Sequence, residues 1–139
     1  MPGARREIAT RPADSEKITI NLGYVDLGRI DLLVKEGFYS NRSDFIRTAI
    51  RSRLVRHDNV LGKTVARHRL ELGLRRVTRD DLEAAKAAGE SLHIQVLGLV
   101  TIAADVTPQL ARETIASLHV LGALQADPAV KAALADRMR

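Results

Sequence analysis

The side chains best suited to catalysis or metal binding are four histidines and an adjacent pair of aspartates, Asp80 and Asp81. The histidines lie far apart in the chain, at His57, His68, His93 and His119, and the chain has no cysteine. No His-x-x-His or carboxylate–histidine motif occurs, and the sequence lacks a glycine-rich phosphate loop and a nucleophile elbow. We therefore expect no enzyme, no cofactor and no metal site. The aspartate pair is interpreted as negative charge at the start of a helix.

A second group of polar side chains belongs to a short alternating segment, Lys17-Ile18-Thr19-Ile20-Asn21-Leu22. Because strand side chains alternate between two faces, Lys17, Thr19 and Asn21 would share one face and the apolar residues the other. Gly23 ends the pattern, and no hairpin partner follows it. A lone strand with one apolar face needs a partner, and a second copy of the same chain is the simplest source. The alternative is that the polar residues form only the solvated face of such a sheet.

Two helices are predicted after this segment. Apolar residues recur at helical spacing from Val25 to Glu36, and Gly37 is suited to end that helix. Ser40 or Asn41 can cap the second helix, with Asp44 three residues after Asn41. The apolar stripe of the second helix consists of Phe45, Ile46, Ala49, Ile50 and Leu54. The rest of its surface is rich in arginine, with Arg42, Arg47, Arg51, Arg53 and Arg56.

The charge of the chain is uneven. The net charge is +5, and residues 1–57 carry eleven Lys and Arg against seven Asp and Glu, whereas residues 58–139 carry eleven against ten. A basic first half is typical of a polyanion-binding protein, although ordinary surface charge explains it equally well. Residues 1–16 are expected to be a flexible basic tail that could add phosphate or minor-groove contacts. Without a membrane-spanning run or a secretory signal, we expect a cytoplasmic protein.

The second half of the chain shows an internal repeat. Residues 58–73 are expected to be a helical connector, interrupted by Gly62 and Gly73. In residues 74–139, Ser91-Leu92-His93 and Val96-Leu97-Gly98 recur as Ser117-Leu118-His119 and Val120-Leu121-Gly122. The period is about 25 residues, and each unit reads as strand, turn and helix. Such a unit cannot bury its apolar face alone, so neighbouring units must stack. A chance similarity within a plain α+β domain is the alternative.

A weaker copy of this repeat is predicted at residues 77–82. There Thr78 could cap a helix, with Asp81 three residues on. His93 and His119 would occupy matching positions in the two clearer copies, which explains their recurrence without a metal.

Residues 16–57 resemble the ribbon-helix-helix family, which includes the CopG-like and Arc/MetJ-like repressors. The resemblance rests on the order of parts, namely the strand Lys17–Leu22, the helix Val25–Glu36, and the segment Gly37-Phe38-Tyr39-Ser40-Asn41-Arg42-Ser43-Asp44-Phe45-Ile46-Arg47. It implies an α+β protein whose residues 17–57 form an intermolecular two-stranded ribbon with two helices per chain. The rest of the chain lies outside the resemblance, and its repeat predicts a small C-terminal domain of strand-turn-helix units. The implied dimer core consists of Ile18, Ile20, Leu22, Phe45, Ile46 and Ile50.

The resemblance also implies a mode of DNA binding. Lys17, Thr19 and Asn21 would contact base edges in the major groove, where lysine suits guanine and asparagine suits adenine. Asn41, Arg42 and Ser43 would contact a phosphate at the start of the second helix, where backbone N–H groups are free.

The expected function is that of a sequence-specific homodimeric transcriptional regulator, and more specifically a repressor, with double-stranded DNA as its partner. Residues 74–139 would drive formation of a higher homo-oligomer or bind a protein partner or effector. Two alternatives stay open. One is an antitoxin of a toxin–antitoxin pair, and the other is a DNA-anchored structural or scaffold protein.

Overall fold

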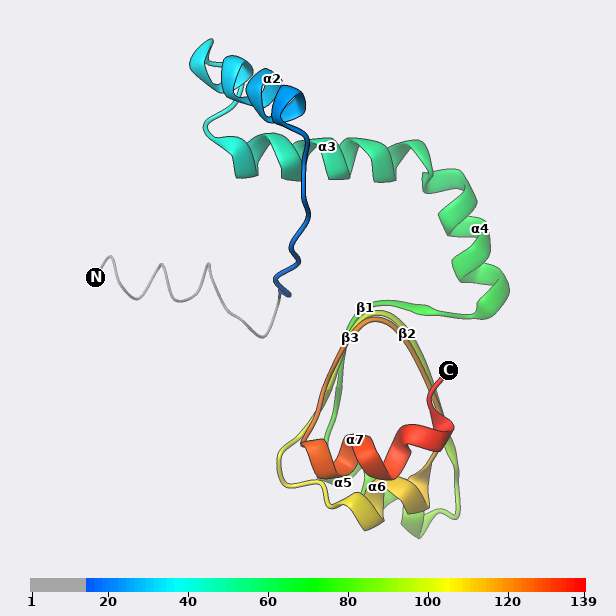
Figure 1. Ribbon diagram of the computed structural model, residues 1–139. Coiled ribbons are helices and arrows are strands. Elements are labelled where there is room, and N and C mark those ends of the chain that lie inside the picture. Colours follow the sequence, from blue (N-terminus) through cyan, green and yellow to red (C-terminus); the bar gives the residue numbers. More distant parts are fainter. Residues whose placement is uncertain (1–14) are drawn as a thin grey trace, which may run out of the picture. The chain divides into compact units, whose positions relative to one another are not determined.

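A computed structural model describes residues 15–139, which form seven helical segments and one three-stranded sheet (Figure 1). The fold is α+β, as predicted. Contacts within the chain divide it into two compact units, which are described separately below. The first is Lys17–Thr64, and the second is Val65–Arg139 together with the described residues before Lys17. The expected tail, residues 1–16, lies almost entirely outside the described residues. No helix among residues 15–139 combines the length and apolar character needed to cross a membrane.

The first unit is helical. Helix α2 spans Tyr24–Lys35 and α3 spans Arg42–Arg56. Helix α4 spans Asp58–His68, so it begins in the first unit and ends in the second. Gly37 ends α2 with a φ of 89°, and the amides of Gly37 and Phe38 donate to carbonyl groups of the last turn of α2. Helix α3 begins where Asn41 accepts a hydrogen bond from the amide of Asp44 at 2.8 Å. Asn41, and not Ser40, is therefore the cap.

The second unit contains a parallel sheet with the strand order β1-β2-β3. Strand β1 spans Glu71–Val77, β2 spans Leu92–Ile102 and β3 spans Ile115–Gln125. Helices follow the strands in turn, with α5 at Arg79–Ala87, α6 at Pro108–Thr114 and α7 at Pro128–Leu134. All three strands bend at the same place, so the sheet forms an arch whose open end is crossed by the helices (Figure 1). The predicted repeat of strand, turn and helix is present three times.

A glycine occupies the bend in every strand. Gly73, Gly98 and Gly122 lie in register across the sheet, with φ values of 122°, 143° and 123° that side chains other than glycine rarely tolerate. At Gly98, an added Cβ would lie 2.0 Å from the carbonyl oxygen of Gly73, and at Gly122 it would lie 2.1 Å from that of Gly98. Close stacking of the bends therefore requires glycine. We name these three residues the glycine ladder.

The core of this unit lies between the arch and the helices. Inward-facing strand residues such as Ile94, Val96 and Val100 are completely or almost completely buried, and so are Leu82 of α5 and Leu134 of α7. Helix α5 starts with the predicted capping box, in which Thr78 and Asp81 exchange side-chain-to-backbone hydrogen bonds of 3.0 and 3.2 Å. A single strand-helix unit could not enclose such a core, which explains why the units stack.

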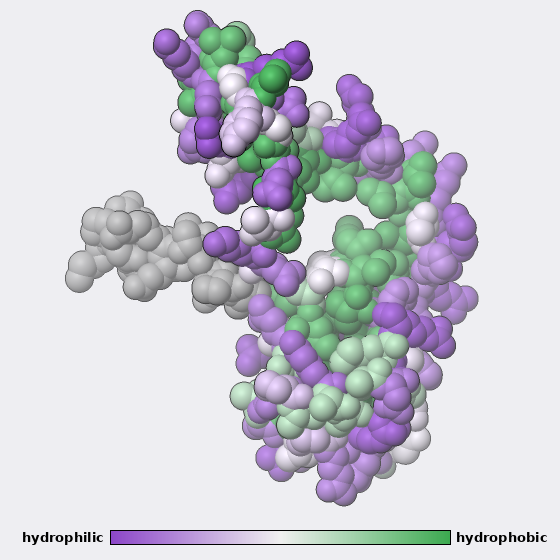
Figure 2. All heavy atoms as spheres, viewed as in Figure 1, coloured by the Kyte–Doolittle hydropathy of each residue, from purple (hydrophilic) through white to green (hydrophobic). Residues whose placement is uncertain are grey.

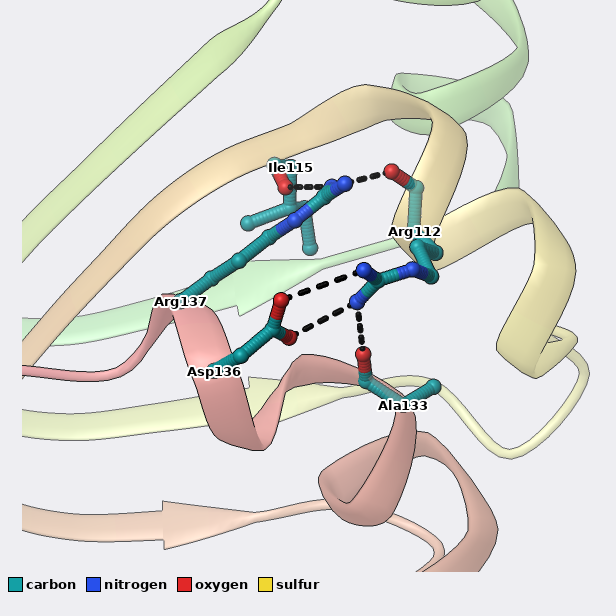
Figure 3. A network of polar contacts seen from close by, with 5 residues as sticks. All are labelled: Arg112, Ile115, Ala133, Asp136 and Arg137. Carbon is teal, nitrogen blue, oxygen red and sulfur yellow. Dashed lines mark hydrogen bonds and ion pairs between the residues drawn. The ribbon is translucent and has the colours of Figure 1, made fainter.

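The end of the chain is attached to the last repeat. Arg112 of α6 donates to both carboxylate oxygens of Asp136, at 2.7 and 3.1 Å, and to the Ala133 carbonyl. Arg137, in the 3-10 helix η2 (Ala135–Arg137), donates to the carbonyls of Arg112 and Ile115 (Figure 3). Residues 138–139 then contact the outer edge of β3, where the Arg139 amide donates to the Leu118 carbonyl at 3.0 Å.

Two sequence-based expectations about the second half need correction. The connector expected at residues 58–73 is helical only as far as His68, because β1 begins at Glu71. Gly73 interrupts no helix and instead forms the bend of β1. His93 and His119 do not match in the sheet, because from His93 onward β2 and β3 pair residues that lie 24 positions apart, whereas the two histidines lie 26 positions apart. His93 pairs with Ser117, while His119 pairs with Gln95.

Candidate nucleic-acid interface

The alternating segment at residues 17–22 has no hydrogen-bonded neighbour strand in the described chain. It has no regular secondary structure, because a β-strand is defined by its hydrogen bonds to a neighbouring strand. The side chains of Lys17, Thr19 and Asn21 are exposed. The apolar residues of the opposite face are exposed as well, with Ile18 at 74% and Ile20 at 60%. Apolar side chains in this position imply a surface that another molecule covers.

The helices beside this segment also lack a core of their own. Within residues 17–64, all of which the structure describes, Ile30 is the only buried residue. Phe45 and Ile46 are half-buried, whereas Ile50 is 48% exposed. All six residues predicted for the dimer core are therefore available to a second chain, and a single chain buries none of them fully. A unit of this size is marginal without a partner.

The start of α3 has the geometry of an anion site. The side chain of Asn41 satisfies the amide of Asp44, and Asp44 in turn accepts from the Ser40 amide at 2.9 Å. Among the described residues, the amides of Arg42 and Ser43 make no hydrogen bond. Both side chains are exposed. Helix α3 is fifteen residues long, so its dipole adds positive potential at this end.

The guanidinium group of Arg42 is held by Asp31 of α2. Its Nε and Nη2 donate to the two carboxylate oxygens at 2.7 and 2.8 Å. These hydrogen bonds lower the pKa of Asp31 and raise the pKa of Arg42. The pair links α2 to the start of α3, and Nη1 takes no part in these two hydrogen bonds. Sequence analysis missed Asp31, because a contact between two helices eleven residues apart has no local pattern.

Other arginines extend the positive charge along α3. Arg47, Arg51, Arg53 and Arg56 are all exposed, and none of them forms an ion pair within the described residues. Acidic residues of the helix are confined to Asp44 in its first turn. The surface of α3 that lies beyond its apolar stripe therefore favours a polyanion.

The histidines are separated in the structure. His93 Nδ1 lies 2.8 Å from the hydroxyl oxygen of Ser117, so the polar partner of this ring nitrogen is a neighbouring side chain. No group of three potential metal ligands occurs among residues 15–139.

A family comparison agrees with this arrangement of parts. The model of the Ribbon-Helix-Helix transcriptional regulator family matches residues 13–131. The chain therefore belongs to this family, which is one of DNA-binding transcriptional regulators. The match extends well beyond the 16–57 segment that carries the resemblance in sequence and includes the arched sheet. No significant match was found among curated proteins or solved structures.

Proposed function

We propose that the protein is a homodimeric, sequence-specific transcriptional repressor whose two chains pair their 17–22 segments as an antiparallel ribbon. The observation that carries the proposal is the alternating segment, whose isoleucines are largely exposed in one chain beside two helices that lack a core. Pairing of two such segments covers the apolar face and satisfies the backbone. The polar face then projects as a two-stranded ribbon of a width that the major groove accepts.

The chemistry of the polar face supports base recognition. Lysine can donate to O6 and N7 of guanine, asparagine can make two hydrogen bonds with adenine, and threonine can donate or contact a thymine methyl group. The start of α3 positions the ribbon by binding a phosphate through the free amides of Arg42 and Ser43. A dimer bound in this way occupies its site and excludes other proteins from it, which is the simplest mode of repression.

Replacement of Lys17 or Asn21 by alanine is expected to relax sequence preference and to leave the dimer intact. Each lost base contact removes about 1–3 kcal/mol of discrimination, while both side chains point away from the apolar face. Selection of binding sites from random duplexes, followed by sequencing, measures this effect. An unchanged consensus site in both variants would contradict the assignment of these residues to base contact.

Replacement of Arg42 by alanine is expected to weaken binding equally for all DNA sequences. A lost phosphate contact reduces the slope of log affinity against log salt by about 0.9. Titrations at several salt concentrations measure the slope. Asp31→Asn is the matched control, because it retains Arg42 and removes a nearby negative charge, so affinity should not fall. A lower affinity for Asp31→Asn together with an unchanged slope for Arg42→Ala would show that the pair serves only to hold the helices.

The C-terminal unit contributes self-association or partner binding in this proposal. Its well-packed core and capped helices distinguish it from a tail that orders only on binding, which is the form expected of many antitoxins. Among the three functions weighed from sequence, this observation favours the regulator over the antitoxin.

A further inference from the structure

The arched sheet has two free edges. Its strand order places β1 at one edge and β3 at the other, and among the described residues no strand pairs with the outer side of either. Free edges of a parallel sheet are templates for further pairing, and proteins usually block them. Here the contact of residues 138–139 with Leu118 blocks β3 at one point. Residues 119–124 of β3 and all of β1 have no strand paired on their outer side among the described residues.

The glycine ladder is complementary at its two ends. Each internal step brings the carbonyl oxygen of one glycine against the Cα of the next, from Gly73 to Gly98 and from Gly98 to Gly122. Gly73 has the same backbone conformation as the other two, yet no heavy atom lies within 4 Å of the position its Cβ would take. The carbonyl oxygen of Gly122 has no further glycine beside it, because β3 is an edge strand. The β1 edge therefore lacks a carbonyl oxygen against Gly73, and the β3 edge presents the unmatched carbonyl oxygen of Gly122.

The outer side chains near the bend show the same incompleteness. Leu72 and Leu74 of β1 are 76% and 73% exposed, whereas their neighbours in β2, Leu97 and Leu99, are partly buried between two strands. Hydrophobic residues gather over the bend of the arch (Figure 2). A strand added outside β1 would place Leu72 and Leu74 in the environment that Leu97 and Leu99 already have.

The open lengths of the two edges also match. The first residue of β1, Glu71, is in register with Val96 and, through β2, with Val120 of β3. The chain terminus contacts β3 at Leu118, two residues before this position. The open part of β3 therefore begins where β1 begins. A hollow beside it is lined mainly by apolar residues, namely Leu118, Val120, Gly122, Leu124, Met138 and Arg139.

Charge is complementary beside the two edges as well. A hollow at the β1 edge includes the carboxylates of Asp81 and Glu90 together with Arg75, and the hollow at the β3 edge includes Arg139.

We propose that β3 of one chain pairs in parallel with β1 of a second copy, so that the stack of arches continues from chain to chain. The register of the existing sheet then places Gly122 opposite Gly73 of the second copy, and Leu121 opposite its Leu72. An antiparallel pairing of β1 with β1 would leave the Gly122 carbonyl of each copy without a glycine beside it. This pairing deepens the self-association role of the C-terminal unit and does not require DNA. Because the contact joins two different edges, it is open-ended and links ribbon dimers into chains.

The consequence for the regulator is cooperative binding. Dimers on adjacent DNA sites would be joined through their arches, so the second dimer binds at a raised effective concentration.

The test uses two full-length variants that each block one edge. Leu72→Asp with Leu74→Asp blocks β1, and Leu121→Asp with Ala123→Asp blocks β3. Sedimentation velocity without DNA is expected to show assemblies larger than a dimer for the unmodified protein, growing with concentration. Each variant alone should require at least about tenfold higher concentration to assemble, equivalent to 1.4 kcal/mol. An equimolar mixture should regain assembly, because one variant retains β3 and the other retains β1.

A control variant carries the same added charge on the helical side of the unit, at the exposed residues Ala104 and Ala129. Ala104→Asp with Ala129→Asp should assemble like the unmodified protein. Circular dichroism checks that each variant is folded. Regained assembly in the mixture is a second check, because only folded sheets have edges that can pair. Assembly that fails to return on mixing would overturn the head-to-tail arrangement. In that arrangement the open β3 of one variant must pair with the open β1 of the other, whereas a contact between identical surfaces is not restored by mixing. An unmodified protein that stays dimeric at all concentrations would overturn the pairing itself.

Failure of this inference is distinguishable from failure of the proposed function. The edge variants should still bind a single DNA site as dimers. Lys17→Ala with Asn21→Ala should lose base preference and still assemble without DNA. Assembly that disappears with the ribbon substitutions and persists in the edge variants would assign self-association to the first unit.

Discussion

Replacement of Ile20 by aspartate is expected to abolish the dimer, the stability of the first unit and DNA binding together. In one chain Ile20 is 60% exposed, so a charge there costs little unless a second chain covers it. In the paired ribbon the carboxylate would enter an apolar core without a partner, at a cost of several kcal/mol. Sedimentation and thermal unfolding, followed by circular dichroism, measure the two losses.

The neighbouring residue provides the control for this experiment. Thr19→Asp adds the same charge on the polar face of the segment, so dimerisation and thermal stability should persist. DNA binding should nevertheless fall, because the carboxylate repels phosphates and can no longer donate to bases. A soluble, folded monomer of Ile20→Asp would show that the ribbon is misplaced. Equal loss of the dimer in both variants would show that the segment has no apolar and polar faces.

Replacement of Gly98 by alanine is expected to unfold the arched sheet, at a cost of about 4 kcal/mol or more. The new Cβ would lie 2.0 Å from the carbonyl oxygen of Gly73 and 2.9 Å from its carbonyl carbon. Both are backbone atoms, which cannot move aside without breaking the register of β1 and β2. The φ of 143° adds conformational strain. Thermal unfolding at low protein concentration, followed by circular dichroism, measures the loss.

Two other glycines separate the steric clash from the strain. Gly73→Ala retains the strain of a positive φ, but its Cβ meets no atom within 4 Å in the same chain, so we expect a loss of about 1–3 kcal/mol. Gly62→Ala lies in α4 with open space around it, and it should stabilise the helix by about 0.5–1 kcal/mol. Equal losses of stability in Gly98→Ala and Gly73→Ala would show that the close approach of neighbouring strands does not constrain the bend.

The helices of the first unit were predicted well from sequence because their signals are local. A glycine at the end of α2 and an asparagine three residues before an aspartate depend on bonds within one or two turns of chain. The alternation at residues 17–22 stays a prediction, because the ribbon that it predicts needs a second chain. The same locality hid the Arg42–Asp31 pair, which exists only because α2 and α3 fold back on each other. The family resemblance supplied the remaining information, and it ended at residue 57, before α4 and the arched sheet.

The sequence by itself indicated two clear strand-turn-helix repeats and a weaker third in the second unit, since helix caps and Leu-Gly pairs recur along the chain. Only the tertiary structure showed that the third has a strand of its own, β1. It also decided the alignment of the repeats. In the sheet Gly98 pairs with Gly122, and in this register His119 lies opposite Gln95 and not opposite His93, although the sequence repeat had matched the two histidines. The meaning of the glycines was also undecided in sequence, because a helix end and a strand bend both use glycine. Which of these it serves depends on the carbonyl of the neighbouring strand, and that contact forms only when the strands stack.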